Sequence, residues 1–364
     1  MGPIVIDARD AAAAELRGWG RYTRELVGAL RGDPALGLEF LVLARGGVGP
    51  EFVFEQLGLP LTLRRRRAAL VHAPNCFLPL LRPCPGVVTI HDLAFETWPG
   101  DFAAATRAKF RLVTPLAARS AQRIICPSEF TAEDVCRRYG VDRAKVRVIP
   151  EAPALALALA LASAGEAPGA EEAPGEGEAS GGVEALGAEE GPYVLAVGDL
   201  RRKKNLGALV RAFAELRREP AIPHRLVLAG VDSGEGARLR ARAGAAPVQL
   251  TGYVSDRRLD ALIRGAEVLV HPSLYEGFGL VMLEAMARGT PVLAARATAL
   301  PETGGDAAEY FEPSEPGDLG RRLGALLDHA ARRAELSRRG RARARAFSWG
   351  RTGAETAAVY RELL

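Results

Sequence analysis

Two glutamates stand eight positions apart in the stretch YEGFGLVMLEAM, with a Gly-Phe-Gly turn and an apolar run between them. A buried strand is predicted before the stretch and a helix from Leu280 onward, which puts Glu276 in the loop and Glu284 within the helix. Gly277 and Gly279 let the backbone approach a ligand closely, and the free N–H groups of the first helical turn suit a phosphate. The two carboxylates would then face different parts of an elongated ligand that carries a diphosphate. A tight turn followed by a helix-dipole glutamate explains the same spacing without a ligand.

A second candidate phosphate site follows the strand predicted in PYVLAVGD, where the chain continues as LRRKKN. The ammonium groups of Lys203 and Lys204, beside Arg201 and Arg202, could neutralise the same diphosphate. A basic loop between a strand and a helix is also common in proteins without such a ligand. The two stretches support each other, because loops at the carboxyl ends of parallel strands gather at one edge of a sheet.

Glycines in RGWGRYT form a third phosphate-compatible turn, at Gly18 and Gly20. The dinucleotide fingerprint G-x-G-x-x-G would need a glycine at Thr23, and it occurs nowhere in the chain, which disfavours a nicotinamide enzyme. The chain also lacks a D-x-D pair to hold a metal ion against a diphosphate. We therefore expect no cofactor and no metal requirement, with lysines and helix dipoles neutralising the charge.

One histidine is placed where it could act on a sugar. The stretch VTIHDLAF puts His91 and Asp92 at the end of a predicted strand. An imidazole there can donate to a sugar hydroxyl or shuttle a proton, although a structural histidine with satisfied partners is the ordinary alternative. His72, after another predicted strand, has a weaker case. The remaining histidines suggest no specific role: His224, His271 and His329.

Short β-rich runs alternate with longer helical patterns, which predicts parallel sheets with crossover helices. One series begins with PIVIDA, and a second begins after residue 191 with PYVLAVGD. At 364 residues the chain is too long for one ordinary core. We predict two doubly wound, Rossmann-like α/β domains over residues 1–151 and 192–345, followed by a closing helix over 346–364.

The intervening segment, 152–191, is built almost wholly from Ala, Glu, Gly, Pro and Leu. Such a composition has little to bury and predicts a flexible acidic linker, although LALALALA could form a local helix or strand. We expect the tract 155–184 to lie outside the catalytic cleft. Its replacement by a short Gly/Ser linker should leave melting temperature and turnover close to those of the wild type.

Charge is unevenly spread along the chain. The net charge is +4, yet residues 151–191 contain nine glutamates and no basic residue, so the rest of the chain has a surplus of positive charge. That surplus suits an anionic ligand, an anionic membrane surface or nucleic acid, and an arginine-rich composition explains it equally well.

The cysteines and the apolar runs indicate the compartment. Cys76, Cys84, Cys126 and Cys136 show neither CxxC spacing nor the density of a disulfide scaffold. No apolar stretch approaches the ~20 residues of a membrane span, and the first residues lack a signal-peptide pattern. We expect a cytoplasmic protein with reduced thiols.

Together these motifs resemble the retaining GT-B glycosyltransferases of family 4, in the branch that includes bacterial mannosyltransferases of surface-polysaccharide synthesis. HPSLYEGFGLVMLEAMARGTPVLAA is similar almost residue for residue to the family's E-x7-E segment. Similar stretches cover nearly the whole chain apart from about 152–184: GWGRYTREL, VVTIHDLAF, ICPSEFTAEDV, VRVIP, PYVLAVGDLRRKKNL, LTGYVSDRRLDALI, ALPETGGDAAEYF and FSWGRTGAETAAVYREL.

The resemblance implies transfer of a hexosyl group, such as mannosyl, from a nucleotide diphosphate sugar with retention at the anomeric carbon. The second domain would bind the donor, the first would bind a glycan or lipid-linked acceptor, and the closing helix would pack back on the first domain. Nucleic acid is not an expected partner. Peripheral contact with the inner face of an anionic membrane is expected from Arg64–Arg67 and from a basic helical pattern: Arg107, Lys109, Arg111, Arg119 and Arg123.

The resemblance also assigns residues to parts of the donor. Glu276 would hold the sugar hydroxyls, Glu284 would hold the ribose, and His91 would lie beside the reacting sugar. The other residues expected at the nucleotide and its diphosphate are Gly18, Gly20, Lys203, Lys204, Tyr253, Val254, Gly277, Phe278, Gly279 and Leu280. Of these, the lysines and the helix start would stabilise the departing diphosphate, and the backbone at 253–254 would lie beside the base.

The chain departs from the family pattern at Val281, where proline is usual, at Lys203, where arginine is usual, and at Glu151, where IPEAP replaces IPNGV. Loss of the guanidinium at position 203 removes one fork of hydrogen bonds. Two alternative functions stay open: a sugar-nucleotide 2-epimerase of the same fold, which would need no acceptor, and a non-catalytic nucleotide-sugar-binding module, which would not hydrolyse the donor.

Overall fold

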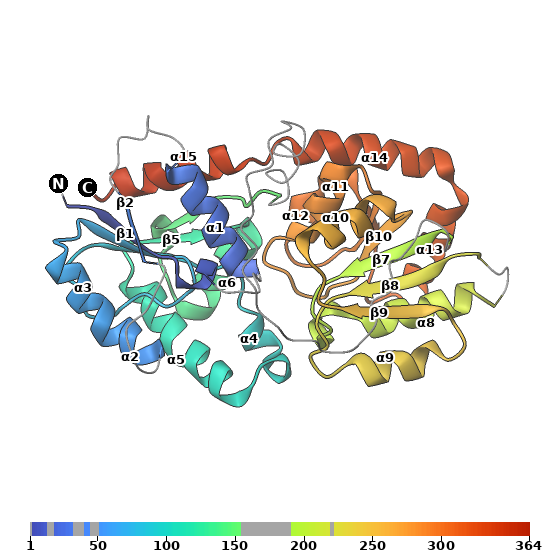
Figure 1. Ribbon diagram of the computed structural model, residues 1–364, viewed down its shortest axis with the longest axis horizontal. Helices are drawn as coiled ribbons and strands as arrows, with labels where there is room; N and C mark the ends of the chain where they lie inside the picture. The colour runs from blue at the N-terminus through green and yellow to red at the C-terminus, as the bar shows by residue number, and fades with distance from the viewer. Residues whose placement is uncertain (1, 13–17, 32–39, 44–50, 154–190, 219–221) are drawn as a thin grey trace, which may run out of the picture.

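A computed structural model describes residues 2–12, 18–31, 40–43, 51–153, 191–218 and 222–364. Two α/β lobes lie side by side, and the last helices of the chain run along both of them (Figure 1). The predicted pair of parallel, doubly wound sheets is confirmed. The tract 155–184 lies outside the described residues, and the predicted domain limits stay predictions.

The first sheet has six parallel strands in the order β2-β1-β3-β4-β5-β6. The strands are β1 Ile4–Asp7, β2 Phe40–Leu43, β3 Leu70–Ala73, β4 Gly86–Thr89, β5 Arg123–Cys126 and β6 Val146–Val148. The longer helices around it are α1 Gly18–Arg31, α3 Leu59–Arg65, α5 Ala104–Ser120 and α6 Glu129–Tyr139. Short helical segments complete this lobe: η1 Arg9–Ala12, α2 Glu51–Val53, η3 Phe54–Gly58, α4 Ala94–Thr97, η4 Pro99–Asp101 and η5 Arg143–Lys145.

The second sheet is also six-stranded and parallel, in the order β12-β11-β10-β7-β8-β9. Its strands are β7 Tyr193–Val197, β8 Arg225–Ala229, β9 Val248–Gly252, β10 Val268–His271, β11 Val292–Ala295 and β12 Glu309–Phe311. The helices that follow its strands are η7 Arg202–Lys204, α8 Leu206–Leu216, α9 Gly236–Ala243, α10 Asp256–Gly265, α11 Leu280–Arg288, α12 Leu300–Gly304, η8 Gly305–Ala307 and α13 Asp318–Asp328.

The strand order of the second sheet determines where a ligand can enter. From β7 the chain builds outward through β8 and β9 on one side and through β10, β11 and β12 on the other. β7 and β10 are neighbours, with Val268 opposite Val194, and the chain continues from β7 to β8 on one side and from β10 to β11 on the other. Open α/β sheets bind ligands at such a switch point.

Local sequence explains the ends of the elements near this point. Ser128 accepts a hydrogen bond from the Thr131 N–H and so caps α6, which ends at Gly140 with a φ of 62°. In β1, Ile4 and Ile6 enter one hydrophobic cluster and Val5 enters another, because successive side chains of a strand face opposite sides of the sheet.

The closing helix packs on the first domain, as predicted. α14 Ala330–Ala344 covers the second lobe, and α15 Trp349–Arg361 then crosses to the first (Figure 1). Tyr360 is fully buried there, its hydroxyl lies 2.7 Å from His72 Nδ1, and the Thr352 hydroxyl donates to the Pro150 carbonyl at 2.8 Å. The predicted free thiols are confirmed for all four cysteines. Among the described residues, no helix has both the length and the apolar character that crossing a bilayer requires.

Candidate active site

The two predicted phosphate loops meet at the switch point between β7 and β10. Lys204 Nζ lies 2.6 Å from Glu276 Oε1, and Lys203 Nζ lies 3.9 Å from Glu276 Oε2. Lys203 also reaches across to the first domain, where its Nζ donates to Asp92 Oδ2 at 3.2 Å. One charged cluster therefore lies at the junction of the domains. It contains two ammonium groups and two carboxylates, those of Lys203, Lys204, Asp92 and Glu276.

Neighbouring opposite charges hold Glu276 and Lys203 in their ionised forms. Burial alone would raise the pKa of Glu276, but the ammonium groups of Lys204 and Lys203 hold it well below its ordinary value. Burial would lower the pKa of Lys203, but Asp92 and Glu276 raise it above its usual value. At neutral pH Glu276 is therefore a carboxylate that only accepts hydrogen bonds.

Glycine is required on both sides of Phe278 for different reasons. A Cβ at Gly277 would lie 1.8 Å from the His91 carbonyl oxygen, so only glycine allows this close approach of the two domains. Gly279 has a φ of 100°, in the left-handed region that side chains rarely adopt. It precedes Leu280, the first residue of α11, and its carbonyl oxygen accepts from the N–H groups of Met282 and Leu283 at 3.0 and 3.3 Å. The N–H groups of Leu280 and Val281 come before the first bonds within the helix. The Phe278 side chain points into the core instead, against Phe347.

Glu284 lies on α11 and contacts the first domain. Its Oε1 is 3.6 Å from Arg21 Nη1, and Arg21 also forms an ion pair with Asp256 at the start of α10. Glu284 is 2% exposed, so this carboxylate lies inside the junction. The residue expected at the ribose thus faces an arginine from the first turns of α1, directly after Gly20.

His91 is buried in the first domain with both ring nitrogens engaged. Nδ1 lies 2.7 Å from Glu151 Oε1, and Nε2 lies 2.9 Å from the Pro74 carbonyl oxygen. The ring is therefore held within its own domain, while its backbone carbonyl lies against Gly277. In this arrangement His91 has no free nitrogen for a proton shuttle.

Further hydrogen bonds join the domains around the Gly277 turn. Ser128 and Thr131 both donate from their hydroxyls to the Gly277 carbonyl, at 2.6 and 3.1 Å. The Tyr275 hydroxyl donates to Asp134 Oδ2 at 2.6 Å, and the Leu93 N–H donates to the same hydroxyl at 3.2 Å. The loop that carries Glu276 is thus fixed by the N-terminal region of α6 on one side and by the strand-end loop after β4 on the other.

Four predicted residues lie farther from the charged cluster. Tyr253 and Val254 occupy the loop between β9 and α10, where Tyr253 is 46% exposed. Gly18 and Gly20 begin α1, whose residues Trp19 and Arg21 reach the junction. None of these four has a hydrogen bond to Glu276 or its lysines among the described residues.

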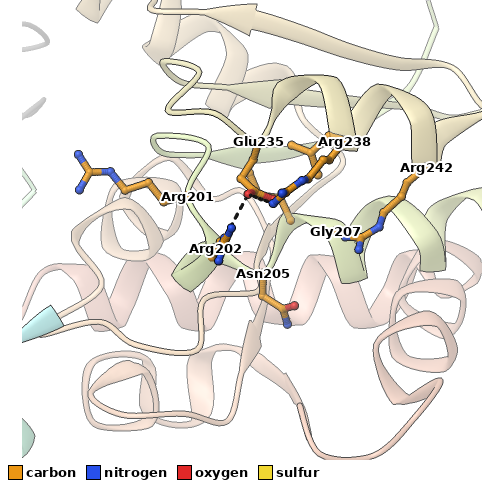
Figure 2. A pocket seen from close by; sticks show the side chains of 9 residues that line it. Arg201, Arg202, Asn205, Gly207, Glu235, Arg238 and Arg242 are labelled. Carbon is orange, nitrogen blue, oxygen red and sulfur yellow. Dashed lines mark hydrogen bonds and ion pairs between the residues drawn. The ribbon is translucent and has the colours of Figure 1, made fainter. Parts of the chain in front are cut away.

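A basic pocket of about 330 Å³ opens beside the cluster, on the other side of the loop after β7. Arg201, Arg202, Arg238 and Arg242 line it around the start of α8, and Glu235 pairs with two of them (Figure 2). None of the four residues of the charged cluster lines this pocket. We place the candidate active site at the cluster, because the loops after β7 and β10 both meet the opposing domain there.

Several residues at the junction were not predicted. His271 ends β10 with Nε2 3.6 Å from Glu276 Oε1, and burial, assisted by the two lysines, lowers its pKa. The rule that singled out His91, a histidine at a strand's carboxyl end, applied equally to it. Thr298 accepts a hydrogen bond from the Glu276 N–H at 3.0 Å in a left-handed conformation, φ 52°, that is strained for a β-branched residue. The sequence had no signal for Thr298.

Two Rossmann-like domains that face each other across a charged switch point define a GT-B glycosyltransferase. Residues 184–343 match the family described as glycosyl transferases group 1, and residues 39–152 match Glycosyltransferase Family 4. The chain is similar over its whole length to the sucrose-phosphate synthase of Thermosynechococcus elongatus, with a TM-score of 0.72, 24% identity and 99% of that chain covered. Anabaena HepE, solved with UDP and glucose, gives a TM-score of 0.69 at 17% identity over all of both chains.

Relatives of known activity agree. The O-antigen chain mannosyltransferase B of Escherichia coli is 28% identical over 83% of this chain and 76% of that protein. The MMP alpha-(1->4)-mannosyltransferase of Mycolicibacterium hassiacum is 40% identical, over 44% of this chain and 40% of its own. The D-inositol 3-phosphate glycosyltransferase of Salinispora tropica is 34% identical, over 66% of this chain and 51% of its own. The chain belongs to the family 4 glycosyltransferases and is an enzyme of that class.

Proposed function

We propose that the enzyme transfers a hexosyl group from a nucleotide diphosphate sugar with retention at the anomeric carbon. The observation that carries the proposal is the position of Glu276 between Lys203, Lys204 and the start of α11, at the switch point of the second sheet. A sugar on that carboxylate puts its diphosphate beside the two ammonium groups and the helix N-terminus. Two relatives are named as mannosyltransferases, which supports mannose as the first sugar to test.

The chemistry follows from where negative charge develops. As the bond between the sugar and the diphosphate breaks, the departing oxygen gains charge. We propose that Lys203, Lys204 and the N–H groups at the start of α11 stabilise that charge, because pre-oriented electrostatic stabilisation commonly contributes more to catalysis than any other single effect. Glu276 stays ionised throughout and serves to hold the sugar hydroxyls.

The test is binding followed by turnover. Melting temperature is measured with UDP, GDP and ADP and their hexose conjugates, because a ligand at 100 times its dissociation constant adds ~2.7 kcal/mol of stability. The stabilising sugar nucleotide is then incubated with and without sugar acceptors, and the anomer of the product is determined by NMR. Inversion at the anomeric carbon, or no release of nucleoside diphosphate with any donor, would contradict the proposal.

The acceptor is proposed to be lipid-linked, with the first domain docking on an anionic membrane. Val53, Leu57 and Leu61 are spaced four residues apart through α2, η3 and α3, and they are 45%, 62% and 55% exposed. Arg64–Arg67 follow at once, all exposed, and their side chains form no ion pair among the described residues. An exposed apolar row that runs into a cluster of cations suits an anionic bilayer surface.

The basic residues of α5 contribute less to the proposed membrane surface than the sequence suggested, because acidic neighbours pair with two of them. Lys109 is bound to Glu51 and Glu55, and Arg111 is bound to Glu96.

Vesicle sedimentation tests the membrane proposal with neutral and anionic lipid. We expect binding to require anionic lipid and to be lost in a Leu57→Ser/Leu61→Ser variant, whereas Leu81→Ser, at an even more exposed leucine elsewhere in the lobe, should bind as the wild type does. Sedimentation that does not depend on anionic lipid would contradict the proposal that the first domain docks on an anionic membrane.

A further inference from the structure

The two ring nitrogens of His91 both face groups that accept hydrogen bonds. The Pro74 carbonyl oxygen, 2.9 Å from Nε2, can only accept, so Nε2 carries a proton. Glu151 Oε1, 2.7 Å from Nδ1, also accepts when the carboxyl group is ionised, so Nδ1 carries the second proton. A neutral imidazole has a single N–H group and cannot donate to both partners. With Glu151 ionised, the two contacts are therefore satisfied only by a charged ring.

The surroundings of His91 leave Glu151 as its one direct counter-ion among the described residues. Both side chains are buried, at 8% and 7% exposure. Asp92, the next residue, directs its carboxylate to Lys203 and to the Ala94 N–H. The other titratable groups nearby are uncharged at neutral pH: Tyr22 from α1, His72 from β3 and Cys76 after β3.

A second buried histidine of the same sheet shows the contrast. His72 lies between two hydroxyls, with Nδ1 2.7 Å from Tyr360 Oη and Nε2 2.8 Å from Thr89 Oγ1. Burial lowers the pKa of His72 to about 3, whereas the hydrogen bond and charge of Glu151 outweigh burial and raise the pKa of His91. One fully buried imidazole is thus neutral at pH 7 and the other is a cation, because only one has a carboxylate partner.

The charged ring is packed against the start of α1. The Trp19 ring is stacked with it, with centroids 6.3 Å apart and planes at 19°, and the Tyr22 ring is nearly perpendicular to it, with centroids 4.5 Å apart and planes at 80°. A cation near an aromatic face is attracted to it, most strongly for Trp. Arg21, between these two aromatic residues, is the side chain that reaches Glu284 and Asp256 of the second domain.

We propose that Glu151 is a positioning residue that holds His91 as an imidazolium cation, and that this cation fixes the first turn of α1 so that Arg21 meets the nucleotide side of the junction. The role of Arg21 rests on the proposed function, whereas the charge on His91 does not. No residue of the cluster around Glu276 is needed for this pairing.

The charge state is tested first, by NMR of the imidazole nitrogens in ¹⁵N-histidine-labelled protein from pH 6 to pH 8. We expect the His91 signals, identified by their loss in His91→Gln, to show two protonated nitrogens at pH 7, while those of His72 show one. In Glu151→Gln the carboxamide can donate to Nδ1 and keep both hydrogen bonds, so His91 should become neutral without moving. A neutral His91 in the wild type overturns the proposal, as does a proton that resides on Glu151.

The consequence is tested by kinetics with the same variant. Glu151→Gln should lower kcat about tenfold at pH 7.5, recover as the pH is lowered, and lose part of its affinity for nucleoside diphosphate. Glu151→Asp, which keeps the charge, should lie closer to the wild type. Glu267→Gln, which neutralises the carboxylate beside His224 in the second domain at 2.9 Å, is the matched control and should leave kcat unchanged.

Two further outcomes separate the positioning role of Glu151 from the proposed function of the enzyme. Full activity of Glu151→Gln with a neutral His91 would overturn the positioning role. Absence of transfer activity in the wild type, together with a charged His91, would overturn the proposed function while the charge assignment stands.

Discussion

The loop after β4 and the loop after β10 touch at His91 and Gly277, yet they hold their charged side chains in different ways. Glu276 is paired with Lys204 of its own domain, from the neighbouring switch-point loop. His91 depends on Glu151, 60 residues further along the chain. The second domain therefore presents a preassembled charge cluster, whereas the first presents a ring whose charge depends on one distant partner. Substitutions in the loop after β4 and in the loop after β10 should therefore affect activity in different ways.

The largest effect is expected for Glu276→Gln. We expect kcat to fall by about 10³-fold while nucleoside diphosphate affinity stays within about twofold, because this carboxylate is assigned to the sugar. Glu284→Gln should instead weaken nucleotide binding about tenfold, since a hydrogen bond to a charged group contributes ~1.5 kcal/mol or more. Calorimetry with the nucleoside diphosphate and steady-state kinetics measure the two effects. Equal loss of nucleotide affinity in both variants would refute the division between sugar and ribose.

The variant Gly277→Ala tests the contact between the two domains at Gly277 and the His91 carbonyl. The added Cβ would lie 1.8 Å from the His91 carbonyl, so the domains must move apart. We expect kcat to fall about 10²-fold, because a misplacement of ~1 Å at the reacting groups has an effect of that size. Gly28→Ala, in α1 with no atom within 4 Å of the new Cβ, is the control and should be as active as the wild type. Wild-type activity of Gly277→Ala would show that this contact does not persist during turnover.

The two buried histidines predict opposite pH dependences of stability. In the folded state His72 titrates at about 3, so between pH 6.5 and 5 only the unfolded chain takes up a proton there, and stability falls by about 1.4 kcal/mol per pH unit. For His91, whose pKa is raised, the contribution is fully present below pH 6.5 and is lost as the pH rises through the folded-state pKa. Urea unfolding should therefore show a weaker acid slope in His72→Gln and a weaker alkaline loss in Glu151→Gln. Slopes that stay unchanged in both variants would show that neither histidine has the shifted pKa assigned to it.

The smallest effect is expected on removal of metal. The lysines beside Glu276, rather than a metal ion, are proposed to neutralise the charge of the leaving group. Transfer in EDTA should stay within about twofold of the untreated rate. Loss of activity that magnesium or manganese restores would show that our account of the leaving group is wrong.

The sequence predicted the site residues that a local pattern marks, and it missed the pairs that join distant parts of the chain. Glu276, Lys203 and Lys204 were found because each lies on a strand–loop–helix stretch whose period and glycines are visible locally. The pairs His91–Glu151, Arg21–Glu284 and Tyr275–Asp134 join distant parts of the chain, and nothing local specifies such partners. The sheets were predictable because buried parallel strands are continuous apolar runs. The short helix α9 was not predicted, since three arginines among its eight residues obscure an apolar face.

The path of α15 has a consequence for biosynthesis. The hydrophobic cluster that contains Ile4, Ile6 and Tyr22 is completed by Ala357, Val359 and Tyr360. A ribosome makes the first group before the second lobe and the second group, near residue 360, after it. Domains usually fold in the order in which they are synthesised. Here the lobe that is translated first cannot bury that face of its sheet until the second lobe has been made, so it is the last to be completed.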